Sequence, residues 1–115
     1  MNDLAIEAIQ GALHGLAARQ RTIADNISNS ETPGFLAGKV SFENSLADAI
    51  SNGGDPGSVQ PAVTRSTAPT NLQGNNVSLD DETVTAMKTD MSYQLMIEAM
   101  TSKFNLLRLS ISGKA

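Results

Sequence analysis

The sequence contains no cysteine, no tryptophan and a single histidine, His14. The absence of cysteine excludes disulfides, thiolate zinc sites and a cysteine nucleophile. Aromatic residues make up 3% of the 115 residues, and 14 of the residues counted as hydrophobic are alanine. Large apolar side chains are therefore too few to fill the core of an independent enzyme, which indicates a chain that packs with partners.

Basic residues do not cluster, and no long apolar run is present. The formal net charge is −4, and nucleic-acid binding needs grouped Lys and Arg, so we expect no nucleic-acid partner. Charges such as Glu7, Arg19 and Asp25 interrupt the first apolar region, which falls short of the roughly 20 apolar residues that cross a bilayer. We expect no membrane span, and the N-terminal residues do not have the pattern of a cleaved signal peptide.

Apolar residues near the N-terminus recur at steps of three and four, the spacing of a coiled-coil helix. We expect this helix over about residues 2–28, with a length of ~40 Å. Its predicted pairing and assembly positions are Ile6, Ile9, Leu13, Leu16, Ile23 and Ile27. Gly11 and Gly15 lie beside them and cost an isolated helix roughly 2 kcal/mol. They are either tolerated on an exposed face or mark a close contact with another helix or subunit.

A second long helix is expected over about residues 79–111, with a length of ~50 Å. Ser78 is the expected N-cap, with Asp81 three positions later. The predicted pairing and assembly positions of this helix are Tyr93, Ile97, Met100, Phe104, Leu107 and Ile111. A second apolar stripe covers the earlier turns and consists of Val84, Met87, Met91 and Leu95.

Between the long helices we expect a turn, a short helix and a polar linker. Pro33 and Gly34 fit the central positions of a type II turn, and the spacing of apolar residues after Phe42 predicts a short helix. Residues 51–76 are rich in small and polar residues without an alternation long enough for a sheet, so we expect an irregular linker. The predicted fold is all-α and extended: one structural unit of three segments, 1–29, 30–77 and 78–115, with the terminal helices paired as a coiled coil.

No residues have the spacing of a catalytic, cofactor or metal site. His14 has no acidic or hydroxyl residue three or four positions away that would form a nucleophile and base pair. Asp80, Asp81 and Glu82 fan around a helix start, where capping and the helix dipole explain them. We find neither a phosphate-binding glycine loop nor an EF-hand spacing. We therefore expect a protein that is not an enzyme and that binds no cofactor or metal.

Two stretches resemble motifs of the bacterial flagellar rod and hook axial proteins. Residues 26–35 read N-I-S-N-S-E-T-P-G-F and are similar to that family's N-I-A-N-A-x-T-P-G-Y/F. The residues that match are Asn26, Ile27, Asn29, Thr32, Pro33, Gly34 and Phe35. Residues 74–82 resemble the G-N-x-V-D-L-x-x-E signature of the proximal rod class through Gly74, Asn75 and Val77. The Phe42 to Leu46 spacing also resembles the short motif by which export gates recognise early substrates.

The resemblance implies a structural subunit of the flagellar basal body rod, whose D0-like helices stack into a shaft that transmits torque across the periplasm. Implied partners are other copies of the chain, the rod proteins FlgC, FlgF and FlgG, and FliE with the export gate or membrane ring at the rod base. The resemblance also implies export by the flagellar type III apparatus without signal cleavage. Two alternatives stay open: a sister rod protein of the FlgC class, and a cytosolic coiled-coil adaptor or export chaperone.

Overall fold

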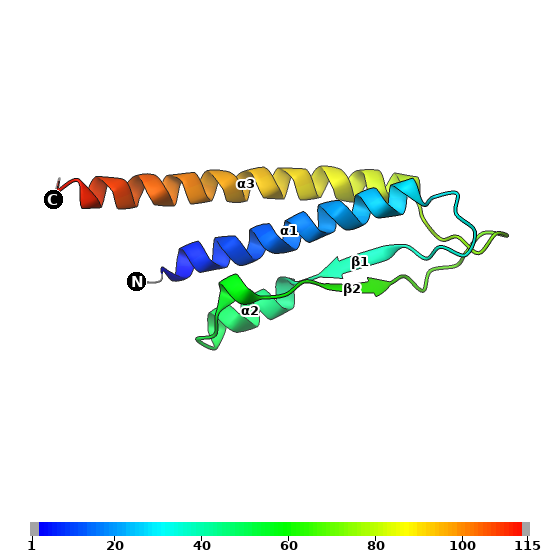
Figure 1. Ribbon diagram of the computed structural model, residues 1–115, viewed down its shortest axis with the longest axis horizontal. Helices are drawn as coiled ribbons and strands as arrows, with labels where there is room; N and C mark the ends of the chain where they lie inside the picture. Colours follow the sequence, from blue (N-terminus) through cyan, green and yellow to red (C-terminus); the bar gives the residue numbers. More distant parts are fainter. Residues whose placement is uncertain (1–2, 114–115) are drawn as a thin grey trace.

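The computed structural model describes residues 3–113. Its elements in chain order are α1 (Leu4–Ser28), β1 (Gly38–Ser41), α2 (Glu43–Ser51), the 3-10 turn η1 (Pro56–Ser58), β2 (Ala62–Arg65) and α3 (Leu79–Ile111). The structure is extended and measures 66 × 26 × 14 Å. α1 and α3 run side by side in opposite directions, and α2 with the strands lies on the other side of α1 (Figure 1). α1 is therefore the middle layer of three.

Local signals at both ends of α1 explain its bounds. The Asp3 carboxylate accepts hydrogen bonds from the backbone N–H of Ala5 at 2.8 Å and of Ile6 at 3.3 Å, so Asp3 is the N-cap. Beyond the helix, the N–H of Phe35 donates to the carbonyl of Thr32 at 3.2 Å, and Gly34 has a φ of 76°. This hydrogen bond and this φ confirm the type II turn that the sequence predicts. The predicted helix start near residue 2 lies outside the described residues.

α3 has the bounds that the sequence predicts. The Ser78 hydroxyl accepts a hydrogen bond from the backbone N–H of Asp81 at 3.2 Å, which confirms the predicted N-cap. Gly113 follows the helix with a φ of 77°, a conformation that suits a helix C-terminus. α3 contains 33 residues against 25 in α1, so one helix is longer than its neighbour.

The prediction of an all-α fold with an irregular linker is wrong for the strands. β1 and β2 form an antiparallel two-stranded sheet in which Gly38 lies opposite Arg65 and Ser41 opposite Ala62. Four-residue strands are too short to show a period of two in the sequence. β1 alternates buried and exposed residues, whereas β2 is exposed throughout. Packing of Val40 with α1 therefore decides this sheet, because strand preference depends on what a strand packs against.

The small core lies where the end of β1 meets α1. Leu16, Ala18, Val40 and Phe42 are buried together, and the partly buried side chains that pack against them are Leu46, Tyr93 and Met96. α2 begins directly after Phe42, which confirms the predicted short helix. Within residues 3–113, no helix has the length and apolar character needed to span a membrane.

Gly11 and Gly15 mark a close contact, which agrees with one of the two interpretations of the sequence. A Cβ on Gly15 would overlap the ring of Phe42, and a Cβ on Gly11 would overlap the carbonyl of Pro56. The residues that use this space belong to the middle segment of the same chain. The glycines therefore let residues 42–56 lie against the backbone of α1, and their helix-weakening effect is offset by this packing.

Candidate functional site

The two sequence motifs meet at one end of the molecule, where α1 enters its turn and α3 begins (right in Figure 1). We call residues 26–38 and 71–82 together the motif junction. Asn26 lies at its centre with 1% of its surface exposed. Its side-chain oxygen accepts the N–H of Gly38 at 2.8 Å, and its amide donates to the Gly38 carbonyl at 3.0 Å and to Glu82 Oε1 at 2.9 Å. One side chain thereby links α1 to β1 and to the first turn of α3.

Asn75 is the second buried asparagine of the motif junction, with 4% of its surface exposed. Its amide donates to the carbonyls of Asn29 and Thr32, both at 2.9 Å. Its side-chain oxygen accepts the N–H of Val77 at 2.8 Å. The Asn29 and Thr32 carbonyls lie just beyond α1 and also accept the backbone N–H of Thr32 and of Phe35, at 3.0 and 3.2 Å. The loop before α3 is thereby fixed against the end of α1.

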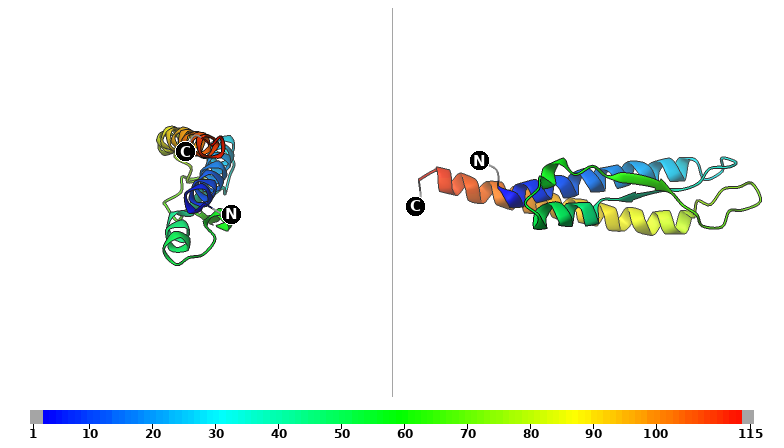
Figure 2. Two further views of the ribbon diagram at one scale, coloured as in Figure 1. Left: turned by 90° about the vertical axis from the view of Figure 1, so that its left-hand side faces the viewer. Right: turned by 90° about the horizontal axis from the view of Figure 1, so that it is seen from below.

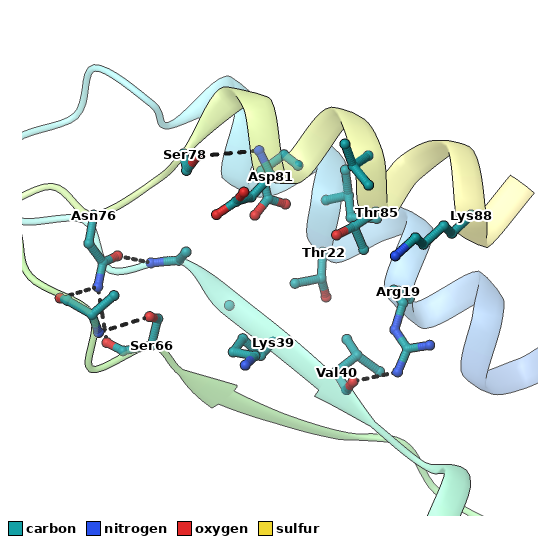
Figure 3. A pocket seen from close by; sticks show the side chains of 16 residues that line it. Arg19, Thr22, Lys39, Val40, Ser66, Asn76, Ser78, Asp81, Thr85 and Lys88 are labelled. Carbon is teal, nitrogen blue, oxygen red and sulfur yellow. Dashed lines mark hydrogen bonds between the residues drawn. The ribbon is translucent and has the colours of Figure 1, made fainter.

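Asn76 extends this network to the loop that follows β2. Its side-chain oxygen accepts the N–H of Ala37 at 2.7 Å, and its amide donates to the carbonyls of Ser66 and Ala68 at 3.2 and 3.1 Å (Figure 3). Asn76 is not among the residues that the sequence motifs single out. Its only sequence signal is that it directly follows Asn75, and its role depends on backbone groups that are brought close only in the folded chain.

The two motif glycines lie next to each other in the motif junction. Gly74 has a φ of 78° and Gly34 a φ of 76°, which is the left-handed conformation that glycine adopts without a steric cost. A Cβ on Gly74 would lie 3.4 Å from the Gly34 Cα. Pro33 is exposed, and Phe35 is half-buried, with the Arg65 guanidinium 5.5 Å from the centre of its ring. The two motifs are therefore two halves of one structural unit.

The polar groups of the motif junction are used by the chain itself. In the part of the chain that the structure describes, every buried side-chain nitrogen and oxygen has a hydrogen-bond partner. Across residues 3–113, no group of three or more His, Asp or Glu side chains is placed to hold a metal ion. The junction therefore acts as a clamp that sets how α1, β1 and α3 are arranged, because a satisfied buried network favours one arrangement.

A second polar cluster fastens the middle segment to α1. The guanidinium of Arg19 donates to both Glu43 carboxylate oxygens, at 2.7 and 3.0 Å, and to the Val40 carbonyl at 2.7 Å. It also lies 5.0 Å from the centre of the Phe42 ring. The hydrogen bonds from Arg19 lower the pKa of Glu43 below its ordinary value, against a smaller opposing effect of burial. Arg19 therefore holds Phe42 in position beside Gly15.

A groove of about 650 Å³ runs between α1, β1 and the first turns of α3 (Figure 3). Arg19, Lys39 and Lys88 give its walls positive charge, and Asp81 and Glu82 give them negative charge. The groove is lined by charges of both signs beside apolar residues such as Ile23, Val40 and Val84, whereas small-molecule sites are lined predominantly by apolar and aromatic side chains. Its lining residues do not form a pair of a nucleophile and a base.

The less exposed residues of α3 include a row at steps of four and three, whose ends contact α1 through Glu82 with Asn26 and Lys103 with Asp3. We call this row the contact line, and it consists of Glu82, Ala86, Thr89, Tyr93, Met96, Met100 and Lys103. Thr89 is buried, and the others are partly exposed. At the far end of the line, the Lys103 Nζ lies 3.1 Å from Asp3 Oδ2. The contact line therefore combines small and polar residues with Tyr93, Met96 and Met100.

Comparison with known proteins identifies the family. Residues 6–35 match the family model described as "Flagella basal body rod protein". Over 120 residues the chain is 31% identical to the flagellar basal body rod protein FlgB of Bacillus subtilis (strain 168), covering 94% of this chain and 93% of that protein. This chain belongs to the flagellar basal body rod protein family.

Membership of the flagellar basal body rod protein family confirms the resemblance seen in the two motifs. It supports a structural role in the basal body and in motility rather than an enzymatic one. The family match covers most of α1 and residues 26–35 of the first half of the motif junction. The similarity to FlgB extends over most of the chain and so includes the other half.

In this rod protein the predicted pairing residues of α1 are mostly covered. Leu16 and Ile23 are buried, Ile27 is 42% exposed, and the partly exposed ones are Ile6, Ile9 and Leu13. On α3, Tyr93 packs against the core that includes Leu16, and Met100 is partly exposed. The structure leaves four predicted pairing residues exposed, namely Ile97 (44%), Phe104 (54%), Leu107 (37%) and Ile111 (85%). Coiled-coil pairing over the full predicted length therefore stays a prediction.

Proposed function

We propose that this rod protein is a proximal rod subunit of the FlgB class that assembles helically with related subunits into the torque-transmitting shaft. The observation that carries the proposal is the similarity to FlgB over 94% of the chain. The outward position of large apolar residues on α3 supports it, because such residues need partners in water. In a helical assembly, neighbouring subunits supply these partners.

The proposed surroundings follow from the family. Neighbours are other copies, the related rod proteins FlgC, FlgF and FlgG, and FliE with the export gate or membrane ring at the base of the rod. The subunit would lie in the part of the rod that crosses the periplasm. An elongated chain of 66 × 26 × 14 Å with two long helices suits lateral packing into a shaft.

Substitutions on the two long helices test the assembly role. We expect Phe104→Asp to abolish swimming while the purified protein keeps its helical circular dichroism, because Phe104 is 54% exposed and is not needed for the core. Leu16→Asp should abolish swimming by a different route, because Leu16 belongs to the core and is 6% exposed. His14→Asp, at an exposed position of α1, is the matched control and should swim normally. Normal swimming of the Phe104→Asp strain would contradict the proposal.

Fractionation separates a rod subunit from a cytosolic adaptor or export chaperone. A rod subunit should co-purify with basal bodies when flagellar type III export is active and remain in the cytosol when export is blocked. Cytosolic protein in both conditions would overturn the proposal. The FlgB and FlgC positions are distinguished by locating a labelled copy in isolated basal bodies, where the FlgB class should lie nearest the rod base.

We also propose that the export gate recognises Phe42 and Leu46 before the chain folds. In the folded chain Phe42 is 5% exposed and Leu46 packs against the core, so a gate would reach them only in an unfolded middle segment. Phe42→Ala removes the motif, whereas Gly15→Ala disturbs the same contact but leaves the motif intact. Export should fall for Phe42→Ala and stay at the wild-type level or rise for Gly15→Ala. An equal fall in both variants would show that folding, not the motif, matters.

A further inference from the structure

α3 projects beyond the start of α1 (Figure 1, left; Figure 2, right). The ion pair between Asp3 and Lys103 marks the point where α1 begins, and we call residues 104–111 the overhang. Phe104, Leu107 and Ile111 continue the contact line past this point at steps of three and four. The overhang therefore extends the established surface of α3 without an α1 to cover it.

A second apolar line lies on the opposite side of α3. We call it the outer stripe, and it consists of Val84, Met87, Met91 and Leu95, which are 51%, 62%, 65% and 58% exposed. At ~100° of rotation per residue it lies roughly 180° from the contact line. No described element covers α3 on the side away from α1 (Figure 2, left). The chain thus carries two different uncovered apolar surfaces on one helix.

We propose that the overhang of one copy packs on the outer stripe of a second copy. This inference rests on the proposed role as a self-assembling rod subunit and names one contact of that assembly. Phe104 supplies a large aromatic anchor. Met87 and Met91 supply flexible side chains that adapt to the shape of a partner.

The charges beside the two surfaces bear on which surfaces pair. Arg108 lies four residues after Phe104 and three before Ile111, so it borders the overhang. Asp80 and Glu98 continue the outer stripe at its two ends, four residues before Val84 and three after Leu95. Lys88 lines the groove at the flank of the stripe. An overhang packed on an overhang brings two Arg108 side chains together, whereas the outer stripe has an acid at each end and Lys88 at its flank, so the charges disfavour overhang with overhang.

The contact joins two different patches, so it is heterologous and leaves each end of a complex open. Each copy can use its overhang once and its outer stripe once, which generates an open helical polymer when the rotation does not close a ring. The centres of the two surfaces are near residues 107 and 90. For parallel helices, adjoining copies are then offset by about 25 Å, from ~1.5 Å per residue.

Two charged variants of the full chain test the pairing in a mixing experiment. Leu107→Asp disables the overhang, and Met91→Asp disables the outer stripe. Thr101→Asp adds the same charge at an exposed position of α3 between the two surfaces and is the matched control. In analytical ultracentrifugation, the wild type and Thr101→Asp should form species larger than dimers as concentration rises. Each variant alone should stay monomeric, and an equimolar mixture of the two should form dimers and nothing larger.

Other outcomes overturn the inference. Dimers or larger species of either variant alone mean that the disabled surface is not required, and a mixture that stays monomeric means that the surfaces do not pair. A wild type that stays monomeric at all concentrations also means that the two surfaces do not pair. Phe104→Asp and Met87→Asp repeat the test at a second residue of each surface, with circular dichroism to verify folding. Co-purification with basal bodies tests the rod role separately, so it can hold when this contact fails.

Discussion

Replacing Asn26 by Ala tests whether the motif junction holds the fold together. The substitution removes three hydrogen bonds and leaves the buried N–H and carbonyl of Gly38 without partners. Each such group costs roughly 1 to 3 kcal/mol. Glu82 is partly exposed, so water replaces the hydrogen bond that its carboxylate loses. The higher helix propensity of Ala returns about 0.5 kcal/mol. We therefore expect a net loss of about 3 kcal/mol.

Urea unfolding followed by circular dichroism measures this loss. With a dependence of about 2 kcal/mol per M, the midpoint should fall by about 1.5 M. Asn44→Ala is the matched control, because it makes the same substitution at an exposed position of α2, and it should change stability by less than about 0.5 kcal/mol. Equal midpoints for the two variants would refute the assignment of Asn26 as the residue that links α1, β1 and α3.

Substitutions at three further positions give measurable results in the same assay. Gly15→Ala should lower the free energy of unfolding by roughly 1 to 3 kcal/mol. The added methyl overlaps the Phe42 ring, and the cost of this overlap exceeds the gain in helix propensity. A stabilised variant would contradict the close contact between Gly15 and Phe42. Hydrogen bonds from Arg19 lower the pKa of Glu43 from 4.5, so their contribution to stability is present above that pH and is lost as pH falls through the lower folded pKa. Glu43→Gln should therefore show a smaller loss of stability between pH 5 and pH 3 than the wild type, and parallel profiles would count against the ion pair. Gly34→Ala should lower the free energy of unfolding by roughly 1 kcal/mol, because Gly34 has a φ of 76°. Gly34→Asn should lower it by less, because Asn tolerates a positive φ better than Ala. Equal losses would argue against the type II turn.

The long helices were predictable because their signals are local. The Ser78 cap is a property of adjacent residues, and α3 has the bounds that its pattern predicts. The turn at Pro33 and Gly34 is equally local, since the two residues restrict the backbone whatever surrounds them. Strand β1 was not predictable, because its four residues become a strand by packing Val40 on α1 and by pairing with β2.

The role of each motif residue was only partly visible in the sequence. The resemblance selected Asn26 and Asn75 without indicating what they bind. Their hydrogen-bond partners lie up to 56 residues away in the chain. Asn76 was missed for the same reason, because an asparagine in a polar loop has no periodic pattern that marks it as structural.

The sequence by itself determined the two long helices, the family and the lack of material for a large core. Helix caps, turn residues and the spacing of apolar residues act over a few positions, so they can be read without the fold. The tertiary structure alone decided which side of α3 meets α1. α3 has large apolar residues on several sides, and of these Tyr93 and Met96 pack against the core, because α1 lies along one side of α3 (Figure 1). The larger residues, such as Phe104 and Met91, are thereby left on the outside of the folded chain.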